Sequence, residues 1–160
     1  MKAPEQLLTQ IGKHWIMSKS IHWTLQNDCP QAWQSKFNTL NYTIQHTPLI
    51  QLHVNKSYST ISKSVDSFDA LIASSQFSAQ KISAILENKK YSFFIVGSQA
   101  SSILKDAGHE ILHISESSAD LAKHLKDKSD VKILHLCSEK SNVDIWPINV
   151  QTLPFYGPVE

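Results

Sequence analysis

Short apolar runs alternate along the chain with segments whose apolar residues recur at helical spacing. The apolar runs predict strands at residues 20–25, 69–74, 92–97, 109–114, 131–137 and 148–156, the last interrupted at Pro154. Residues 42–54 are expected to be extended, with a break near Pro48. The helical spacing covers residues 28–41, 78–88, 98–108 and 117–128. The pattern therefore predicts strands and helices in alternation.

End signals support the predicted helices. Asp28 stands where it could cap the first helix, with Pro30 in the first turn. Ser117 or Ser118 could cap the last helix, and Gly108 lies just past the end of the third. These residues indicate where the helices begin and end.

The alternation of strands with helices of modest length predicts an α/β fold. Parallel strands need crossover connections, which helices supply, so we expect a mainly parallel sheet with helices on both faces. The runs "ALIA" and "VKILHL" suit strands that are buried on both sides. Residues 1–19 fit no such unit and are predicted to be an N-terminal extension.

Composition narrows the classes of function. The chain has 160 residues, 41% hydrophobic and 18% charged, with a formal net charge of +1. These values suit a globular domain, and the lack of a basic stripe argues against a nucleic-acid partner. The apolar runs are too short to span a membrane, and the opening "MKAPEQLLTQIGKHW" lacks the apolar core of a signal peptide. We therefore expect a cytoplasmic protein with Cys29 and Cys137 as free thiols.

The eight histidines raise the question of a metal site. None falls in H-E-x-x-H or beside a C-x-x-C arrangement. His109 and His113 are four residues apart, but "HEILHI" is more typical of a strand than of a helix. The histidines are therefore predicted to be ordinary surface or half-buried residues, and no metal is expected.

The turn at Gly97 is the first candidate for a ligand site, because ligands lie outside the carboxyl ends of strands in open α/β sheets. The stretch "FFIVGSQASSILKDAG" lacks the further glycines of a dinucleotide fingerprint and the G-K-[ST] of a phosphate loop, so a nucleotide is the weakest alternative. Gly97 could simply give a tight turn, or Ser98 and the N–H groups of the next helix could bind a carboxylate.

Hydroxyl groups stand at three further turns. Ser74 and Ser75 follow one predicted strand, where either could cap a helix, bind a ligand or do both. Ser138 follows Cys137 in "HLCSEKSN", and no acid or histidine is placed by spacing to activate that thiol. Tyr156, near the chain end, offers a donor on a rigid ring, although packing is the commoner role.

Taken in order, these segments resemble uroporphyrinogen-III synthase. "FDALIASSQFSAQKI" is similar to the family's D-x-I-x-F-T-S-x-x-A-V, and "FFIVGSQASSILKDAGHEI" to V-G-x-x-T-A-x-x-L-x-x-x-G. "SESSADLAKHL" resembles a serine-led helix, "VKILHLCSEKS" stands where the family has V-L-x-x-R-G-x, and "INVQTLPFYGPVE" matches V-x-x-x-x-x-Y. The opening strand, helix and strand up to "TPLIQL" are also similar, so the resemblance covers residues 20–160.

The resemblance implies two flavodoxin-like or Rossmann-like α/β domains with the active site in the cleft between them. It also implies a cofactor-free enzyme that converts hydroxymethylbilane to uroporphyrinogen III, losing water and inverting ring D in tetrapyrrole biosynthesis. The family tyrosine, a candidate for protonating the departing hydroxyl, falls on Tyr156. The substrate-binding positions that it suggests are Ser74, Ser75, Gly97, Ser98 and Ser138.

The chain departs from the family pattern at several points. A family threonine falls on Ala100, the R-G pair falls on Cys137 and Ser138, and an opening arginine falls on Leu25. In this family one domain is built from both ends of the chain and the other from its middle. Residues 20–46 are therefore expected to be a partial first domain, 47–156 a complete middle domain and 157–160 the start of a return connection.

Three hypotheses follow. The first is a uroporphyrinogen-III synthase, and the second is a degenerate or truncated synthase-like domain without catalysis that binds anions at most. A generic flavodoxin-like or nucleotide module ranks last, because the chain has no acidic pocket motif and no phosphate loop. In the partial first domain, Trp23, Trp33 and Phe37 are expected to be exposed and to promote association.

Overall fold

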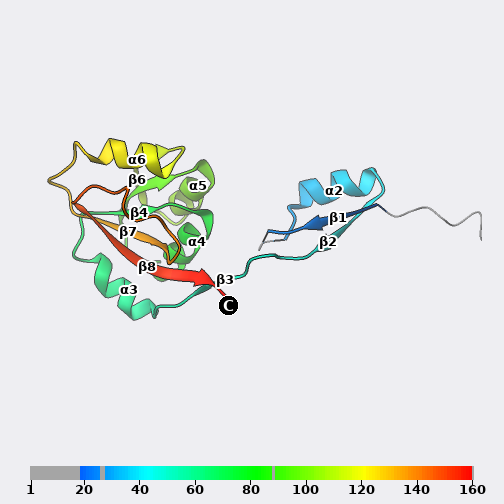
Figure 1. Ribbon diagram of the computed structural model, residues 1–160, viewed down its shortest axis with the longest axis horizontal. Coiled ribbons are helices and arrows are strands. Elements are labelled where there is room, and N and C mark those ends of the chain that lie inside the picture. The colour runs from blue at the N-terminus through cyan, green and yellow to red at the C-terminus, as the bar shows by residue number, and fades with distance from the viewer. Residues whose placement is uncertain (1–18, 26–27, 88, 160) are drawn as a thin grey trace, which may run out of the picture. The chain divides into compact units, whose positions relative to one another are not determined.

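The computed structural model describes residues 19–25, 28–87 and 89–159 (Figure 1). The predicted N-terminal extension, residues 1–19, lies outside this part of the chain except for Lys19. The chain divides into a first compact unit, Met1–Gln51, and a second, Leu52–Glu160.

The second unit is built on a six-stranded sheet. Its strands are β3 (Leu52–Val54), β4 (Ala70–Ala73), β5 (Ser92–Val96), β6 (Glu110–Ser115), β7 (Ile133–Ser138) and β8 (Val150–Pro158). Their order across the sheet is β3-β8-β7-β4-β5-β6. Neighbouring strands are parallel except β3 and β8, which are antiparallel. The predicted α/β fold with a mainly parallel sheet is therefore confirmed.

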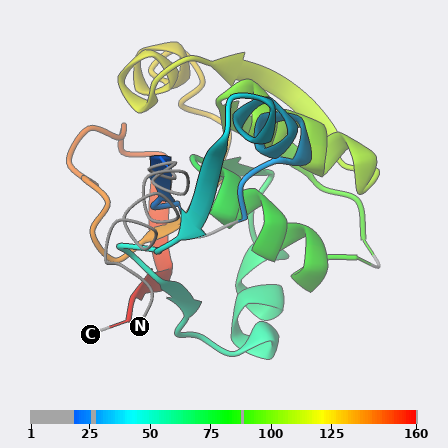
Figure 2. The ribbon, with the colours of Figure 1, turned by 90° about the vertical axis from the view of Figure 1, so that its right-hand side faces the viewer.

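Helices cover both faces of this sheet. The helices α3 (Tyr58–Val65), α4 (Gln76–Ile85) and α5 (Ser98–Asp106) share one buried cluster with Leu71, Phe93 and Leu134 of the strands. Helix α6 (Ser118–Leu125) shares a second cluster with Ile72 and Phe94, whose side chains point to the other face. Figures 1 and 2 show α3 and α6 on opposite sides of the strands.

Serine caps start three of these helices. Ser57, Ser75 and Ser117 each accept a hydrogen bond from the backbone N–H three residues on. Ser117 is one of the two residues predicted to cap α6, and Gly108 follows the end of α5 with a φ of 83°, as predicted. Helix α3 was not predicted from the sequence, although its Ser57 cap precedes it directly.

Strand β8 runs without a break through Pro154, so the predicted interruption there is wrong. The ladder pairs Cys137 with Pro154 and then Ser138 with Tyr156, and its register shifts between Cys137 and Ser138. Proline has no N–H to donate to a ladder and is tolerated at such irregularities. The shift places Tyr156 beside Ser138 at the end of β7.

The first unit contains strands β1 (Lys19–Trp23) and β2 (Tyr42–His46), which are parallel, with helix α2 (Gln31–Thr39) between them. Pro30, not Asp28, precedes α2 as its cap, so the predicted Asp28 cap is wrong. The Asp28 carboxylate instead lies 3.0 Å from His46 Nδ1.

No residue of α2 is buried, and Trp33 keeps 53% of its surface exposed within the chain. Two strands and one helix enclose too little apolar volume for a core of their own. The predicted exposure is therefore confirmed for Trp33, whereas Trp23 and Phe37 are partly buried.

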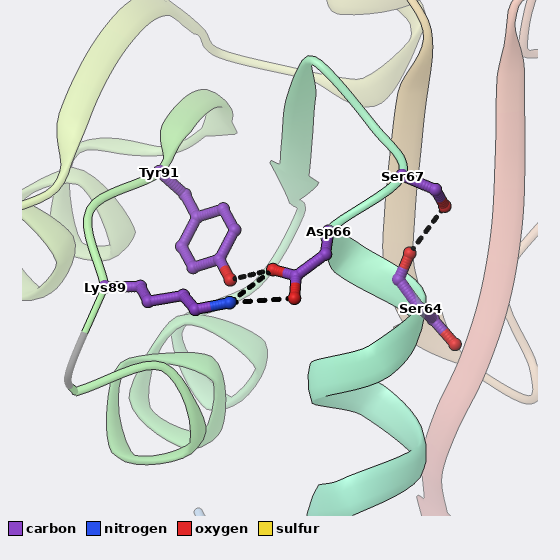
Figure 3. A network of polar contacts seen from close by, with 5 residues as sticks. All are labelled: Ser64, Asp66, Ser67, Lys89 and Tyr91. Carbon is purple, nitrogen blue, oxygen red and sulfur yellow. Dashed lines mark hydrogen bonds and ion pairs between the residues drawn. The ribbon is translucent and has the colours of Figure 1, made fainter.

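A polar network joins the end of α3 to the start of β5 (Figure 3). Asp66 accepts hydrogen bonds from Lys89 Nζ at 2.8 and 2.9 Å and from the Tyr91 hydroxyl at 2.7 Å. These donors hold the pKa of Asp66 below its ordinary value, with Lys89 contributing most. Nearby, the Ser67 hydroxyl donates to the backbone oxygen of Ser64 at 3.0 Å. The network therefore ties the α3–β4 connection to the α4–β5 connection.

Gly97→Ala is expected to destabilise the second unit by about 1–3 kcal/mol, because an L-residue rarely adopts such a backbone conformation. Gly97 has φ 87° and ψ 143°, and a Cβ built on it would meet no atom within 4 Å, so the cost is conformational rather than steric. Urea unfolding measures the change. The matched control is Ser98→Ala at the exposed next position. A Gly97→Ala variant as stable as that control contradicts the argument.

Candidate functional site at the switch point of the sheet

The sheet reverses its winding between β4 and β7. From β4 the chain adds β5 and β6 on one side, and it then returns to add β7 and β8 on the other. Ligands of open α/β sheets bind outside the carboxyl ends of the strands at such a reversal. Residues 74, 75, 97, 98, 138 and 156 lie at or near these strand ends, and we call them the switch-point edge.

Ser75 and Tyr156 meet at this edge. The two hydroxyl oxygens lie 2.9 Å apart, although 81 residues separate them in sequence. Ser75 also caps α4 by accepting from the N–H of Ser78 at 3.0 Å. The Tyr156 ring is 5% exposed and packs against Phe77, with ring centroids 4.9 Å apart. Burial raises the pKa of the Tyr156 phenol, so it stays protonated at neutral pH.

Ser74 points to the opposite face of the sheet, because successive residues leaving a strand alternate in direction. Its hydroxyl lies 2.8 Å from Nε2 of His135, which belongs to β7. His135 is 2% exposed, and burial lowers its pKa to about 4. The imidazole is therefore neutral at physiological pH and acts as a neutral hydrogen-bonding partner of Ser74.

Gly97 and Ser98 begin α5 one strand further along the sheet. The Gly97 N–H donates to the Ser115 carbonyl at 2.9 Å, which ties the turn to the end of β6. Among the described residues no side chain caps α5, so its first N–H groups keep their capacity to bind an anion. Gly97 thus serves the tight turn that the sequence suggested, and the anion-binding alternative stays open.

The structure brings some of the predicted site residues together and separates others. Ser75, Ser138 and Tyr156 are neighbours: Ser138 pairs with Tyr156 in the ladder, and its hydroxyl accepts from the Lys140 N–H at 3.2 Å. Ser74 engages the other face through His135. Ala100, where the family has threonine, is buried at 2% exposure. The serines at 74 and 75 therefore serve two separate hydrogen-bonded pairs.

Sequence reasoning missed His135, and the prediction of surface or half-buried histidines is wrong for His109 and His135. Their exposed fractions are 5% and 2%. The position of His135 inside the apolar run "VKILHLC" was a usable signal, because a strand covered on both faces buries every side chain it carries. Its partner Ser74 is 61 residues away, and nothing in the local sequence predicts that pair.

The remaining candidates for chemistry are the two cysteines, possible metal ligands and a hollow in the second unit. Cys137 and Cys29 are free thiols, as predicted. Both are buried, and burial raises the pKa of the Cys137 thiol. No three His, Cys, Asp or Glu side chains gather as metal ligands in the described part of the chain. Within the same residues no helix is long and apolar enough to cross a membrane. A hollow of about 290 Å³ lies at the opposite, amino end of β5 and β6, beside Tyr91 and His109.

Comparison with known proteins supports the architecture. No family model and no curated protein matches the chain. Among solved structures, it is similar to a mutant uroporphyrinogen III synthase from the extremely thermophilic bacterium Thermus thermophilus, at 12% identity and a TM-score of 0.56. The likeness shows the fold. It covers 88% of this chain and 63% of that chain, so the chain spans less than two thirds of the synthase.

The burial of His135 predicts a pH-dependent loss of stability. Its pKa is about 4 in the folded chain against an ordinary 6.5, so the unfolded chain binds the proton first as pH falls. This histidine alone should lower the free energy of unfolding by roughly 3 kcal/mol between pH 6.5 and 4, and by nothing above pH 7. Urea unfolding of wild type and His135→Gln across that range isolates the effect. Parallel curves for the two proteins contradict it.

Proposed function

We propose that this chain acts as a uroporphyrinogen-III synthase, closing hydroxymethylbilane to uroporphyrinogen III with loss of water and inversion of ring D. The observation that carries the proposal is the Ser75–Tyr156 pair at the switch-point edge, in a fold shared with a synthase. The sequence motifs over residues 20–160 support it independently. We further propose a cytoplasmic location, and that the second unit is the complete middle domain and the first a partial one.

Tyr156 is the proposed proton donor to the departing hydroxyl. Ser75 accepts from the Ser78 N–H and can give its own proton to the Tyr156 oxygen, which leaves the tyrosine O–H free to point at a ligand. The raised pKa keeps that proton on the phenol at neutral pH. Tyr156 therefore keeps its proton in the resting enzyme and, as a general acid, gives it to the departing hydroxyl, which leaves as water. The phenolate that results regains a proton, the one that the substrate releases during ring closure.

The acidic substrate would be held by neutral donors. The uncapped N–H groups at the start of α5 and the hydroxyls of Ser74, Ser98 and Ser138 would bind its carboxylates. Holding the linear tetrapyrrole folded would place ring D against its partner carbon, and such positioning supplies a large share of the rate. Loss of water gives an azafulvene, ring D attacks through its substituted carbon, and the spiro intermediate reopens and recloses inverted. No cofactor enters this proposal.

A second candidate is a non-catalytic domain that binds anions. Two observations favour it: Ala100 offers no hydroxyl where the family has threonine, and Tyr156 is 5% exposed within the described residues. The neutral donors at the switch-point edge would then hold a carboxylate without promoting chemistry.

Product analysis separates these candidates. The purified 160-residue chain is incubated with fresh hydroxymethylbilane, the products are oxidised, and the porphyrin isomers are separated by HPLC. Spontaneous closure gives the type I isomer, so a protein-dependent rise in type III is the expected result. Type I alone, from chain shown to be folded by circular dichroism, contradicts the synthase proposal.

Tyr156→Phe tests the assigned acid. Removing the hydroxyl while keeping the ring should lower the rate of type III formation at least about tenfold, because a positioned acid contributes that much or more. Tyr91→Phe is the matched control, since its hydroxyl serves the Asp66 network far along the strand from the switch-point edge. Equal rates for the two variants would remove Tyr156 from the chemistry.

A further inference from the structure

Two side chains near Ser74, His135 and Trp146, have rings in contact, and each carries a buried nitrogen without a hydrogen-bond partner in the part of the chain that the structure describes. Within the described residues, Nδ1 of His135 and Nε1 of Trp146 are buried and lack a hydrogen-bond partner. Their rings pack edge to face, with centroids 4.7 Å apart and an interplanar angle of 63°. Buried polar atoms in native proteins are nearly always paired, so this coincidence calls for a chemical explanation.

The two atoms are complementary in one protonation pattern. The tryptophan Nε1–H is a donor only, whereas a neutral imidazole carries one donor and one acceptor nitrogen. The structure shows no direct hydrogen bond between the two atoms, so a bridge needs one buried water. If Nδ1 of His135 is the acceptor, that water can accept from the Trp146 N–H and donate to Nδ1. If Nδ1 carries the proton instead, both nitrogens are donors, and a water that accepts from both finds no acceptor on either ring for its own hydrogens. Complementarity therefore favours a proton on Nε2.

The proton on Nε2 determines what Ser74 can do. Nε2 lies 2.8 Å from the Ser74 oxygen, so its N–H donates to that oxygen and occupies a lone pair. The hydroxyl hydrogen of Ser74 is then free for a ligand, and the bond from the imidazole polarises it. Ser74 is only partly buried, at the carboxyl end of β4. The Ser74 hydroxyl would therefore present one oriented hydrogen-bond donor to a group that only accepts, such as a carboxylate.

We propose that His135 and Trp146 are positioning residues that fix Ser74 as a hydrogen-bond donor to a ligand carboxylate at the switch point. The identity of that ligand as an acidic tetrapyrrole rests on the proposed function, whereas the protonation pattern does not. Burial keeps the imidazole of His135 neutral well below pH 7, so one of its two nitrogens is an acceptor there. Loop residue Trp146 thereby acts on Ser74 through a histidine on β7.

The first test reads the imidazole directly in the ligand-free chain. Long-range ¹H–¹⁵N spectra of protein labelled at histidine distinguish a proton on Nε2 from one on Nδ1. We expect His135 to be in the Nε2–H form at pH 7, and Trp146→Phe, which keeps an aromatic ring but removes the donor, to shift it toward the Nδ1–H form. A wild-type Nδ1–H form, or a spectrum unchanged by Trp146→Phe, overturns the proposal.

The second test asks whether the donor reaches a ligand. Uroporphyrin III, an oxidised polycarboxylate, serves as the probe, and its affinity is measured by fluorescence. Ser74→Ala should weaken binding about tenfold, because a hydrogen bond to a charged acceptor is lost. His135→Leu should also weaken it, because Ser74 loses the partner that orients its hydroxyl. His135→Gln should retain most of the affinity, since its amide N–H can replace Nε2–H. Ser102→Ala, on the exposed side of α5, is the control and should bind as wild type does.

The two tests distinguish failure of the donor assigned to Ser74 from failure of the proposed function. Undiminished binding by Ser74→Ala overturns the assigned donor even if the chain is an active synthase. No binding of the probe by wild type overturns the carboxylate assignment together with the proposed function, while the histidine spectrum still decides the protonation pattern.

Discussion

Burial of β4 on both faces governs the candidate site. All four residues of Ala70–Ala73 are buried, and β5 and β7 take up the backbone hydrogen bonds on either side. A strand in this position can carry no unpaired polar side chain, because an unsatisfied buried group costs about 1–3 kcal/mol. The first polar side chains therefore lie just beyond the strand, at Ser74 and Ser75.

Because side chains alternate in direction along the chain here, the two serines lie on opposite faces of the sheet. Ser75 turns toward the face of α4 and meets Tyr156 from β8. Ser74 turns toward the face of α6 and meets His135 from β7. The partner of each serine lies on β7 or β8, the strands that follow the reversal of the sheet. Both pairs therefore form only when β7 and β8 are in place. The shifted register at Ser138 brings Tyr156 to the level of the strand ends.

The sequence carried enough local information to predict the framework of the second unit. Apolar runs marked β4, β5 and β7, and local signals marked the Ser117 cap and Gly108. Helix α3 was missed because its exposed face is rich in serine and threonine, and only Ile61 and Val65 are buried. The Asp28 cap failed because Pro30 starts α2 and the carboxylate finds His46 instead.

The candidate site was predictable only in part, since its decisive contacts join distant segments. Ser75 was singled out by its place after a strand and Tyr156 by its hydroxyl near the chain end, and the resemblance suggested their roles. Nothing in their spacing predicted that the two would meet. The role of His135 was hidden because its partner depends on the pairing of β4 with β7. Trp146 comes from a loop whose local sequence gives no sign that its ring reaches that histidine.

Mapping a ligand onto the chain tests the central claim most directly. Amide ¹H–¹⁵N spectra of the labelled protein are recorded as uroporphyrin III is added. We expect changes concentrated at residues 74–79, 97–101, 138–139 and 156, around the reversal between β4 and β7. Changes concentrated instead at the opposite end of the sheet, around Lys90 and His109, or no changes at all, would contradict that claim.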